Sequence, residues 1–564
     1  MRVHYPRTPH LPWSPGAAAD DLRSGDLSGL AGAEVVVTEK LDGENTTLYA
    51  DGLHARSLDS AHHPSRAWVK GLQGRIGAHL PAGWRICGEN LFARHSLAYT
   101  DLDSWFYGFS VWTAEDRCLD WDATVRFLRR LGVPAPRVLW RGRYDERALR
   151  ALKFDLNRQE GYVVRTVDGF DRGEFGRRVA KWVRPQHVQT DTHWMHAAVV
   201  ENGLGPNSAL WHVRSGGAPD PDGLAQALGL PVLPELDRIA DRLDALGRTG
   251  DARLSGVLAA GLRAERREEL MPRLAPQLGL RWARRTADLV GLHPLVERPY
   301  PDDERRAGLV RLSAAADLGV LHAVAATAFP GSEQVAWSAL HAEDAGLLAA
   351  DPLAALRSGL REALAGLGPD IRDRCWAQAR EAYALERIAT AEEAVAATWA
   401  RRDGAFPRLV HLCGPAGSGK STFAATLPGA RIALDDLRAA RGSRTEQRDN
   451  PEVLREGLTA LEAALAGGGA AVWDATSLNR HQRSHVQAIA QRRDALLTQV
   501  VMAVDPVELA RRNATRRHPV AAEVLTAQLH RWSPPYPGQA HRTWYVGADG
   551  AVRDTAGSLD EDED

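Results

Sequence analysis

The spacing of apolar residues divides this chain into three segments with different patterns. Before residue 196, short apolar runs alternate with clusters of Gly, Asp and Ser, which predicts strands joined by turns. The runs expected to form strands are Glu34–Thr38, Thr46–Ala50, Trp84–Cys87, Trp105–Trp112, Gly161–Thr166 and Val179–Val183. Such a series is typical of a mainly antiparallel α+β domain.

The other two segments have longer periods. Residues 196–400 repeat apolar positions at helical spacing, most clearly in Asp351–Leu367 and Ile371–Trp399. Residues 401–545 alternate apolar strands with helices, which predicts a parallel sheet with crossover helices. The strands expected there are Leu409–Cys413, Arg431–Leu434, Ala470–Trp473 and Thr498–Val504. We therefore expect a multidomain chain: α+β over 1–195, mostly α-helical over 196–400, and α/β over 401–564.

Composition and charge indicate the cellular compartment and the kinds of partner that this chain can have. Its net charge is −2, so a nucleic-acid surface would have to be a local patch of arginines. The four cysteines show no CxxC spacing, which argues against a disulfide framework or a zinc site and favours a reducing cytoplasm. We expect no signal peptide and no membrane span, because no stretch approaches about 18 apolar residues. Residues 559–564, five of which are acidic, predict a solvated tail.

Lysine is scarce, and its few positions are informative. Of 70 Lys and Arg residues only five are lysine: Lys40, Lys70, Lys153, Lys181 and Lys420. Genome base composition can account for the scarcity but not for the places where lysine remains. Lysine can act as a nucleophile, whereas arginine is in effect always protonated. Three of the five lie inside patterns that handle phosphates or nucleotides.

The pattern around Lys420 is the most specific in the chain. Residues 414–421 match GxxxxGK[ST], after an apolar strand and before a helix. Glycines there let backbone N–H groups surround phosphate oxygens, while the lysine neutralises the β and γ phosphates and Ser421 holds Mg²⁺ or Mn²⁺. We expect ATP to contact Gly414, Gly417, Ser418, Gly419, Lys420, Ser421 and Thr422.

Charged residues follow the next strands of the same domain. Asp435 lies at a strand tip, where a carboxylate can accept a proton from a substrate hydroxyl, and Asp474 follows the third strand. Arg512 and Arg516 are four apart, which puts them on one face of a helix. Read alone, this arginine run is more often a solvated helix face, but a P-loop kinase needs guanidiniums on the transferring phosphoryl group.

These motifs in order resemble the 5′-OH polynucleotide kinase family over roughly 150 residues. The shared patterns are the P-loop, D-D-x-R, D-x-T-x-x-N and R-N-x-x-R. The resemblance implies that Asp435 is the general base and that Arg438 contacts the acceptor strand. It implies that Arg512 and Arg516 lie on the donor phosphates and that Asp474 organises the acceptor side. The competing interpretation is a small-molecule kinase of the zeta-toxin type.

A second set of motifs surrounds Lys40. Lys40-Leu41-Asp42-Gly43 follows a strand, and a Lys before an Asp-Gly turn is by itself usually a hairpin. Further motifs follow in order, however: Arg56, Cys87-Gly88-Glu89-Asn90, Phe106-Tyr107-Gly108-Phe109, Glu160-Gly161-Tyr162-Val163-Val164-Arg165 and Lys181. The whole set resembles ATP-dependent RNA ligases over about 190 residues. On this resemblance Lys40 attacks the α phosphate of ATP, and the residues expected to bind the nucleotide are Asn45, Arg56, Glu89, Phe109, Glu160, Lys181 and Arg184.

The resemblance also implies individual roles. Glu89 holds the ribose, Phe109 stacks on adenine and Glu160 helps to bind the metal. We expect Arg56 and Lys181 to lower the pKa of Lys40, since an attacking amine must lose its proton. The family's second lysine of the last motif is replaced here by Val183, and Arg184 is the candidate to take over its phosphate contact.

The middle segment carries no motif of this quality. Asp220 and Asp222 imitate a phosphatase DxDG, but a Gly/Pro-rich loop precedes them, so we expect a turn. We also find no pair of HxT motifs, so a separate 3′-end phosphatase or phosphodiesterase is expected. We thus predict a bifunctional kinase and ligase for RNA with broken ends, such as tRNA. The alternative is a small-molecule kinase with a nucleic-acid-binding, non-ligating N-terminal domain.

Overall fold

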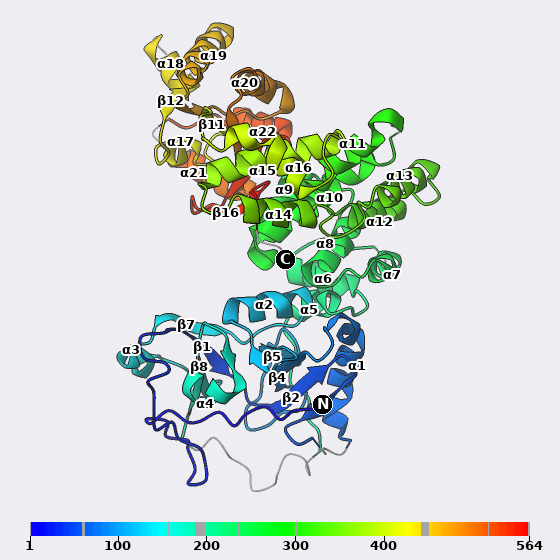
Figure 1. Ribbon diagram of the computed structural model, residues 1–564, viewed down its shortest axis with the longest axis vertical. Coiled ribbons are helices and arrows are strands. Elements are labelled where there is room, and N and C mark those ends of the chain that lie inside the picture. The colour runs from blue at the N-terminus through cyan, green and yellow to red at the C-terminus, as the bar shows by residue number, and fades with distance from the viewer. Residues whose placement is uncertain are drawn as a thin grey trace. The chain divides into compact units, whose positions relative to one another are not determined.

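The computed structural model of this chain describes residues 2–58, 62–155, 157–185, 198–234, 236–298, 302–441, 450–516 and 518–561. Packing groups the chain into two units, residues 1–254 and residues 255–563 (Figure 1). Each unit is described by itself below. The division into three domains at residues 195 and 400 stays a prediction.

The first unit is built on two antiparallel sheets. One has the order β10-β8-β1-β7, with β1 (Glu34–Lys40), β7 (Val138–Arg143), β8 (Gly161–Thr166) and β10 (Val179–Val183). The other has the order β3-β2-β4-β5-β6-β9, with β2 (Glu44–Tyr49), β3 (Gly52–Ala55), β4 (Arg85–Asn90), β5 (Phe106–Trp112), β6 (Arg117–Cys118) and β9 (Phe170–Asp171). All six strands predicted in this segment are present, and the predicted α+β class is confirmed.

The valine run of β1 is buried on both faces. Val35 and Val37 pack in one hydrophobic cluster with Tyr162 and Val164, while Val36 packs on the other side against Trp121. This burial explains why the strand is continuously apolar rather than alternating. The run ends at the polar residues Glu39 and Lys40, which therefore emerge at the edge of the core.

Short helices complete this unit: α1 (Ala67–Ile76), α2 (Trp121–Arg130), α3 (Glu146–Ala151), α4 (Phe175–Arg178), α5 (Ser208–Arg214), α6 (Pro221–Leu228) and α7 (Asp237–Ala245). Asp220 is the N-cap of α6, where its side chain accepts a hydrogen bond from the backbone N–H of Asp222. The pair thus begins a helix and does not end a strand, which removes the geometry of a phosphatase site.

The second unit contains a six-stranded sheet of order β12-β13-β11-β14-β15-β16. The strands are β11 (Arg408–Cys413), β12 (Ala430–Ala433), β13 (Ala470–Asp474), β14 (Leu496–Met502), β15 (Arg542–Val546) and β16 (Val552–Ala556). All neighbours are parallel except β15 and β16, so the predicted parallel sheet is confirmed with an antiparallel edge. The sequence did not predict β15 and β16.

Helices of this region connect and cover the strands: α17 (Lys420–Ala424), α18 (Leu434–Ala440), α19 (Asn450–Ala466), α20 (Arg480–Arg492), α21 (Pro506–Ala514) and α22 (Ala522–Arg531). Leu461 of α19 and Val486 of α20 pack with Leu409 and Leu497 of the sheet. The crossover helices thus bury one face of the strands, as the alternating pattern requires.

The helical middle region is also confirmed: α8 (Gly250–Gly261, spanning the unit boundary), α9 (Arg267–Leu278), α10 (Leu280–Leu292), α11 (Asp302–Ser313), α12 (Leu318–Ala328), α13 (Glu333–Asp344), α14 (Ala354–Ala363), α15 (Pro369–Ala384) and α16 (Ala391–Ala397). The run predicted over Ile371–Trp399 is not one helix. It breaks after α15 because Glu386 has φ 57° and Thr390 begins α16 with a capping box.

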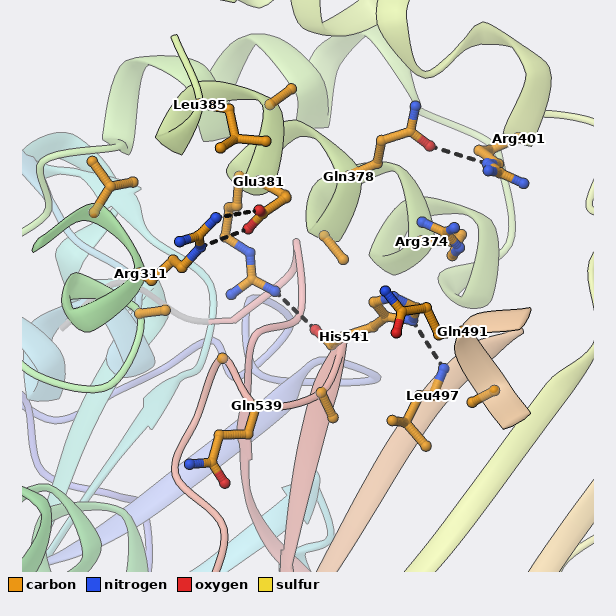
Figure 2. A pocket seen from close by; sticks show the side chains of 18 of the residues that line it. Arg311, Arg374, Gln378, Glu381, Leu385, Arg401, Gln491, Leu497, Gln539 and His541 are labelled. Atoms are coloured by element: carbon orange, nitrogen blue, oxygen red, sulfur yellow. Dashed lines mark hydrogen bonds and ion pairs between the residues drawn. The ribbon is translucent and has the colours of Figure 1, made fainter. Parts of the chain in front are cut away.

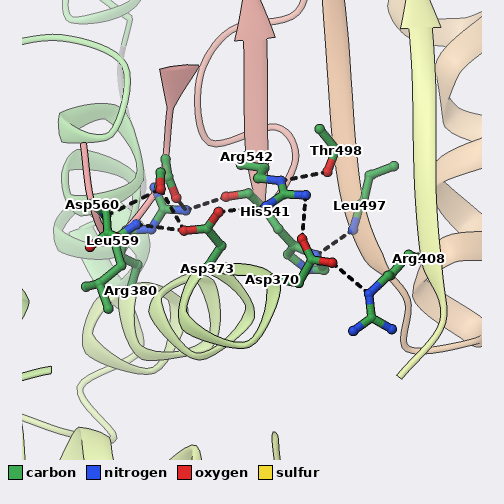
Figure 3. A network of polar contacts seen from close by, with 12 residues as sticks. Asp370, Asp373, Arg380, Arg408, Leu497, Thr498, His541, Arg542, Leu559 and Asp560 are labelled. Carbon is green, nitrogen blue, oxygen red and sulfur yellow. Dashed lines mark hydrogen bonds and ion pairs between the residues drawn. The ribbon is translucent and has the colours of Figure 1, made fainter. Parts of the chain in front are cut away.

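Buried ion pairs join these helices to the sheet (Figure 3). Arg542 of β15 donates to Asp370 and Asp373 of α15, at 2.8 Å each. Arg284 of α10 donates at 2.8 Å to Asp554 of β16. Residues 255–400 therefore pack as part of the sheet's own unit.

No single helix in the described part of the chain has the length and hydropathy needed to cross a membrane. One pair of helices, Glu304–Ser313 and Leu318–Ala328, passes that test only when counted together, and it is bent by 105°.

Candidate active sites

Lys40 is positioned by the central strand of the first sheet. It is the last residue of β1 and pairs in register with Gly161 of β8. Glu160 precedes β8, so the same pairing brings its carboxylate to the lysine, and the two form an ion pair. Lys40 Nζ also donates to the carbonyl of Leu41 at 3.5 Å. The nucleophile and the expected metal-binding carboxylate thus meet across neighbouring strands.

The carboxylates control the charge of Lys40. Burial alone would lower its pKa, but Glu160 and Glu89 raise the pKa of Lys40 above its ordinary value. The expectation that cations lower this pKa is therefore wrong for this structure, because the charges of Glu160 and Glu89 outweigh burial. Burial and the charge of Lys40 instead lower the pKa of Lys181, to which Arg56 also contributes.

Glu89 and Asn45 come from the second sheet. They are direct partners in the pairing of β2 with β4. Burial raises the pKa of Glu89 to about 7, against the opposing effect of Lys40. Glu89 also accepts a hydrogen bond from the backbone N–H of Gly43 at 3.2 Å. A Cβ on Gly43 would lie 2.5 Å from the carbonyl oxygen of Asn90, so the turn after Lys40 requires glycine.

Phe109 has an aromatic neighbour that the sequence did not indicate. It lies in β5 and contacts Tyr5 edge to face, with 5.2 Å between ring centroids. Tyr5 also contacts Phe175 at 5.3 Å, and burial raises the pKa of its hydroxyl. A base that stacks on Phe109 would therefore share this ring with Tyr5.

Backbone contacts hold the other residues around Lys40 in place. Asp42 accepts hydrogen bonds from the backbone N–H groups of Ser96 and Leu97, both at 2.9 Å, and so fixes the turn. The N-terminal segment runs beside Lys181, whose backbone N–H donates to Pro9 at 2.9 Å. Arg184 follows β10, and its backbone N–H donates to the carbonyl of Glu160 at 3.0 Å.

The second site lies at the carboxyl end of β11. The P-loop from Gly414 to Ser421 joins this strand to α17, in the position that the motif predicts. Gly417 has φ +82° and Gly419 has φ +94°, so both require the left-handed region that glycine favours. Ser418 and Thr422 lie in the same loop and helix. Lys420 Nζ donates to the carbonyl of Pro415 at 2.8 Å, and burial lowers its pKa to about 8.

Asp474 contacts the P-loop directly. It ends β13, and its carboxylate accepts a hydrogen bond from Ser421 Oγ at 3.3 Å. Arg431 of β12 donates to the other oxygen at 2.6 and 3.0 Å. The resemblance gave Asp474 a role on the acceptor side, but the structure places it beside the hydroxyl expected to hold the metal ion. Hard oxygen ligands of this kind suit Mg²⁺ or Mn²⁺.

Asp435 and one lid arginine, Arg516, act on Lys420 from separate parts of the chain. The charges of Asp474, Asp435 and Arg516 all act on the pKa of this lysine. Asp435 is exposed near the start of α18, where Arg438 donates to it at 2.5 Å. Arg438 thus contacts the expected general base.

The lid differs in one respect from the predicted helix. α21 ends at Ala514, so Arg512 lies in the helix and Arg516 beyond it, and the two do not share a helix face. Asn513 accounts for this turn, because its side chain exchanges hydrogen bonds of 2.6 and 2.9 Å with the backbone of Val520. Arg512 donates to Glu508 and to the carbonyl of Ala548, at 2.7 Å each. The sequence gave no signal for Gln528, which accepts the Ala416 N–H at 2.8 Å.

Family models match one segment in each half of the chain. Residues 33–183 match the RNA ligase family model, and residues 409–535 match that of an AAA domain. The chain therefore carries an RNA ligase domain near its N-terminus and a P-loop domain near its C-terminus. A comparison with curated proteins finds no match.

Solved structures resemble separate parts of the chain. The Pnkp1/Rnl/Hen1 RNA repair complex is similar at 20% identity over 22% of this chain and 44% of that one, with TM-score 0.21. An RNA ligase of Naegleria gruberi with AMP and manganese is similar at 17% identity over 28% and 52%, with TM-score 0.22. A gluconokinase from Sinorhizobium meliloti is similar at 22% identity over 25% and 83%, with TM-score 0.20. The chain thus spans less than half of the repair-complex chain.

Proposed function

We propose that this chain heals and seals broken RNA ends, with a 5′-hydroxyl kinase in its P-loop unit and a ligase in its first unit. The observation that carries the proposal is the pair of lysine sites. Lys40 lies among two carboxylates inside the segment that matches RNA ligases, and Lys420 lies in a complete P-loop. One chain thus has a nucleophile for ATP's α phosphate and a cradle for its β and γ phosphates.

The kinase step uses the residues at the strand ends. Asp435 accepts the proton of an RNA 5′-hydroxyl as its oxygen attacks the γ phosphorus of ATP, and ADP leaves. Lys420, Arg512 and Arg516 stabilise the charge that the phosphoryl group spreads over its oxygens. Ser421 and Asp474 would hold the divalent ion, which neutralises phosphate charge when bound.

The ligase step begins at Lys40. Its amine, after losing a proton, attacks the α phosphorus of ATP, pyrophosphate leaves and a lysyl-AMP phosphoramidate forms. The RNA 5′-phosphate then takes the AMP, and a 3′-hydroxyl displaces AMP to close the strand. Glu160 would bind a divalent ion, and any cation there would weaken its hold on the Lys40 proton. Glu89 would accept hydrogen bonds from the ribose hydroxyls, and Phe109 would stack on the base.

The proposal also includes a cellular compartment and an RNA substrate. We place the protein in the cytoplasm, since all four cysteines are buried and free. RNA with broken ends, such as tRNA, is the substrate, and a separate enzyme exposes the 3′-hydroxyl.

Covalent labelling tests the proposal most directly. Incubation with α-labelled ATP should attach AMP to the wild-type protein and not to Lys40→Arg, which keeps the charge but cannot act as nucleophile. The variant should still phosphorylate 5′-hydroxyl RNA. Absence of any protein-bound label in the wild type would favour the alternative, a small-molecule kinase with a nucleic-acid-binding, non-ligating domain.

A further inference from the structure

A cavity of about 810 Å³ lies within the second unit, between the helical region and the sheet (Figure 2). Its walls come from α11, α15, α20, the start of β14 and the loop before β15. This volume lies in the range of sites that hold small ligands, on the order of 300–1,000 Å³.

The cavity is remote from the P-loop. Leu497, near the beginning of β14, and His541, just before β15, line it. The P-loop follows the opposite end of β11, which runs parallel to β14. A strand of this length spans about 20 Å, so the cavity and the P-loop lie at opposite ends of the parallel strands. The proposed kinase mechanism therefore makes no use of the cavity.

Positive charge dominates its lining. Five arginines contribute to the wall: Arg311, Arg374, Arg380, Arg387 and Arg401. The single acid among the lining residues is Glu381, and Arg311 already pairs with it at 2.6 Å. Behind the wall, Asp494 is shared by Arg374 and Arg401. The acids therefore leave the cavity with a net positive charge.

Arg380 has no direct ion pair within the described ranges. Its Nη2 donates to the carbonyls of His541 and Gly557, at 2.8 and 3.5 Å (Figure 3). Its Nε has no hydrogen-bond acceptor in those ranges either, nor has Nε of Arg374. Burial lowers the pKa of Arg380 to about 10. The charges of Glu561 and Asp373 also act on Arg380, but neither acid forms a direct ion pair with it, so its desolvated guanidinium favours binding of an anion.

The uncharged groups of the wall suit a base and a sugar. His541 accepts the Leu497 N–H on Nδ1 at 2.9 Å, and burial lowers its pKa to about 3, so the ring is neutral and Nε2 carries a hydrogen. Four glutamine amides and an apolar surface complete the wall, with members Gln378, Gln487, Gln491, Gln539, Leu385, Ile388 and Leu497. Amides pair with base edges, and guanidiniums bind phosphate or stack on rings.

We propose that this cavity binds a phosphorylated nucleotide, either free or at the end of a nucleic-acid strand. The arginines bind the phosphate, and the amides and apolar side chains hold the nucleoside. The cavity shares no lining residue with either proposed catalytic centre. The helical region would therefore help to form a separate ligand-binding site.

Equilibrium binding of labelled uridine 5′-monophosphate to the full chain tests the proposal. We expect the labelled nucleotide to bind saturably. Unlabelled uridine and inorganic phosphate should each displace it far less effectively than unlabelled nucleotide does. Gln491→Glu adds a carboxylate at an exposed helical position of the cavity and should weaken binding about tenfold. Arg387→Gln, which removes one charge, should weaken it at least about threefold. The matched control is Gln334→Glu on α13, outside the cavity, which should bind as the wild type.

Other outcomes would overturn the proposal. These are no saturable binding, equal competition by inorganic phosphate, wild-type affinity in both cavity variants, or loss of binding in Lys420→Ala, which would place the nucleotide in the P-loop. A 5′-phosphorylated RNA tetranucleotide distinguishes the two sources. Binding at least tenfold tighter than the mononucleotide, with the same sensitivity to Gln491→Glu, identifies a strand end as the ligand. Equal or weaker binding identifies a free nucleotide.

Discussion

The ion pairs between α15 and β15 predict that the kinase depends on the helical region for its stability. Asp373 is the central acceptor of this network: it is 3% exposed and binds Arg542 at 2.8 Å, Ser558 Oγ at 2.7 Å and the Leu559 N–H at 2.9 Å. Asp373→Asn keeps the shape but removes the charge opposite a buried guanidinium. Breaking one partner of a buried pair costs about 3–5 kcal/mol. Because Arg542 retains Asp370, we expect the lower end, about 3 kcal/mol.

The assay compares two activities of one protein. In a unit of this size about 1 kcal/mol shifts the melting temperature by roughly 2 °C, so kinase activity should be lost about 6 °C lower in the variant. Protein–AMP formation belongs to the other unit and should be lost at the wild-type temperature. Asp560→Asn is the matched control, since that acid pairs with Arg372 at the surface and should cost less than about 0.5 kcal/mol.

Two results would refute this reasoning. An unchanged kinase inactivation temperature in Asp373→Asn would show that the network contributes nothing measurable. An equal fall of both activities would show that the loss is not specific to the unit that contains α15.

Three further predictions concern chemistry. Asp435→Asn and Arg512→Ala should each slow 5′-phosphorylation at least about 100-fold while sealing of 5′-phosphorylated RNA continues; near-normal kinase rates in both would mean that the site is misassigned. Since burial raises the pKa of Glu89 to about 7, its contribution to stability is lost as pH rises through that value, and Glu89→Gln should raise the melting temperature of the ligase unit at pH 8 with little change at pH 5. A larger stabilisation at pH 5 would reverse the sign and contradict the assignment. Purified protein should leave ends with a 2′,3′-cyclic phosphate unjoined until another enzyme exposes the 3′-hydroxyl; joining without that enzyme would reveal a third catalytic site.

Local patterns predicted the parts of the fold whose causes are local. The P-loop lies between strand and helix as its motif requires, and the valine run predicted as a strand forms β1, which extends two residues past the predicted end to Lys40. The break after α15 could also have been read from the capping box at Thr390 and Glu393.

Contacts between residues far apart in the sequence could not be predicted from local patterns. Lys40 and Glu160 are 120 residues apart, so the sign of the lysine's pKa shift depended on a strand pairing that no single motif encodes. Buried ion pairs of arginine could not be predicted either, because arginine is so frequent in this chain. Arg284 and Arg542 are buried and structural, yet in the sequence nothing separates them from arginines at the surface.

The two lysines of the proposed sites have opposite pKa shifts, and each direction fits its task. At Lys420, burial outweighs the charges of Asp474 and Asp435 and lowers the pKa to about 8, and phosphates would restore the charge of the lysine as they bind. Lys40 lies against Glu160 and Glu89, which keep it protonated and therefore unreactive. A cation that neutralises Glu160 removes the larger of these two attractions. In the proposed ligase mechanism, Lys40 would therefore become reactive only when a divalent ion is bound at Glu160.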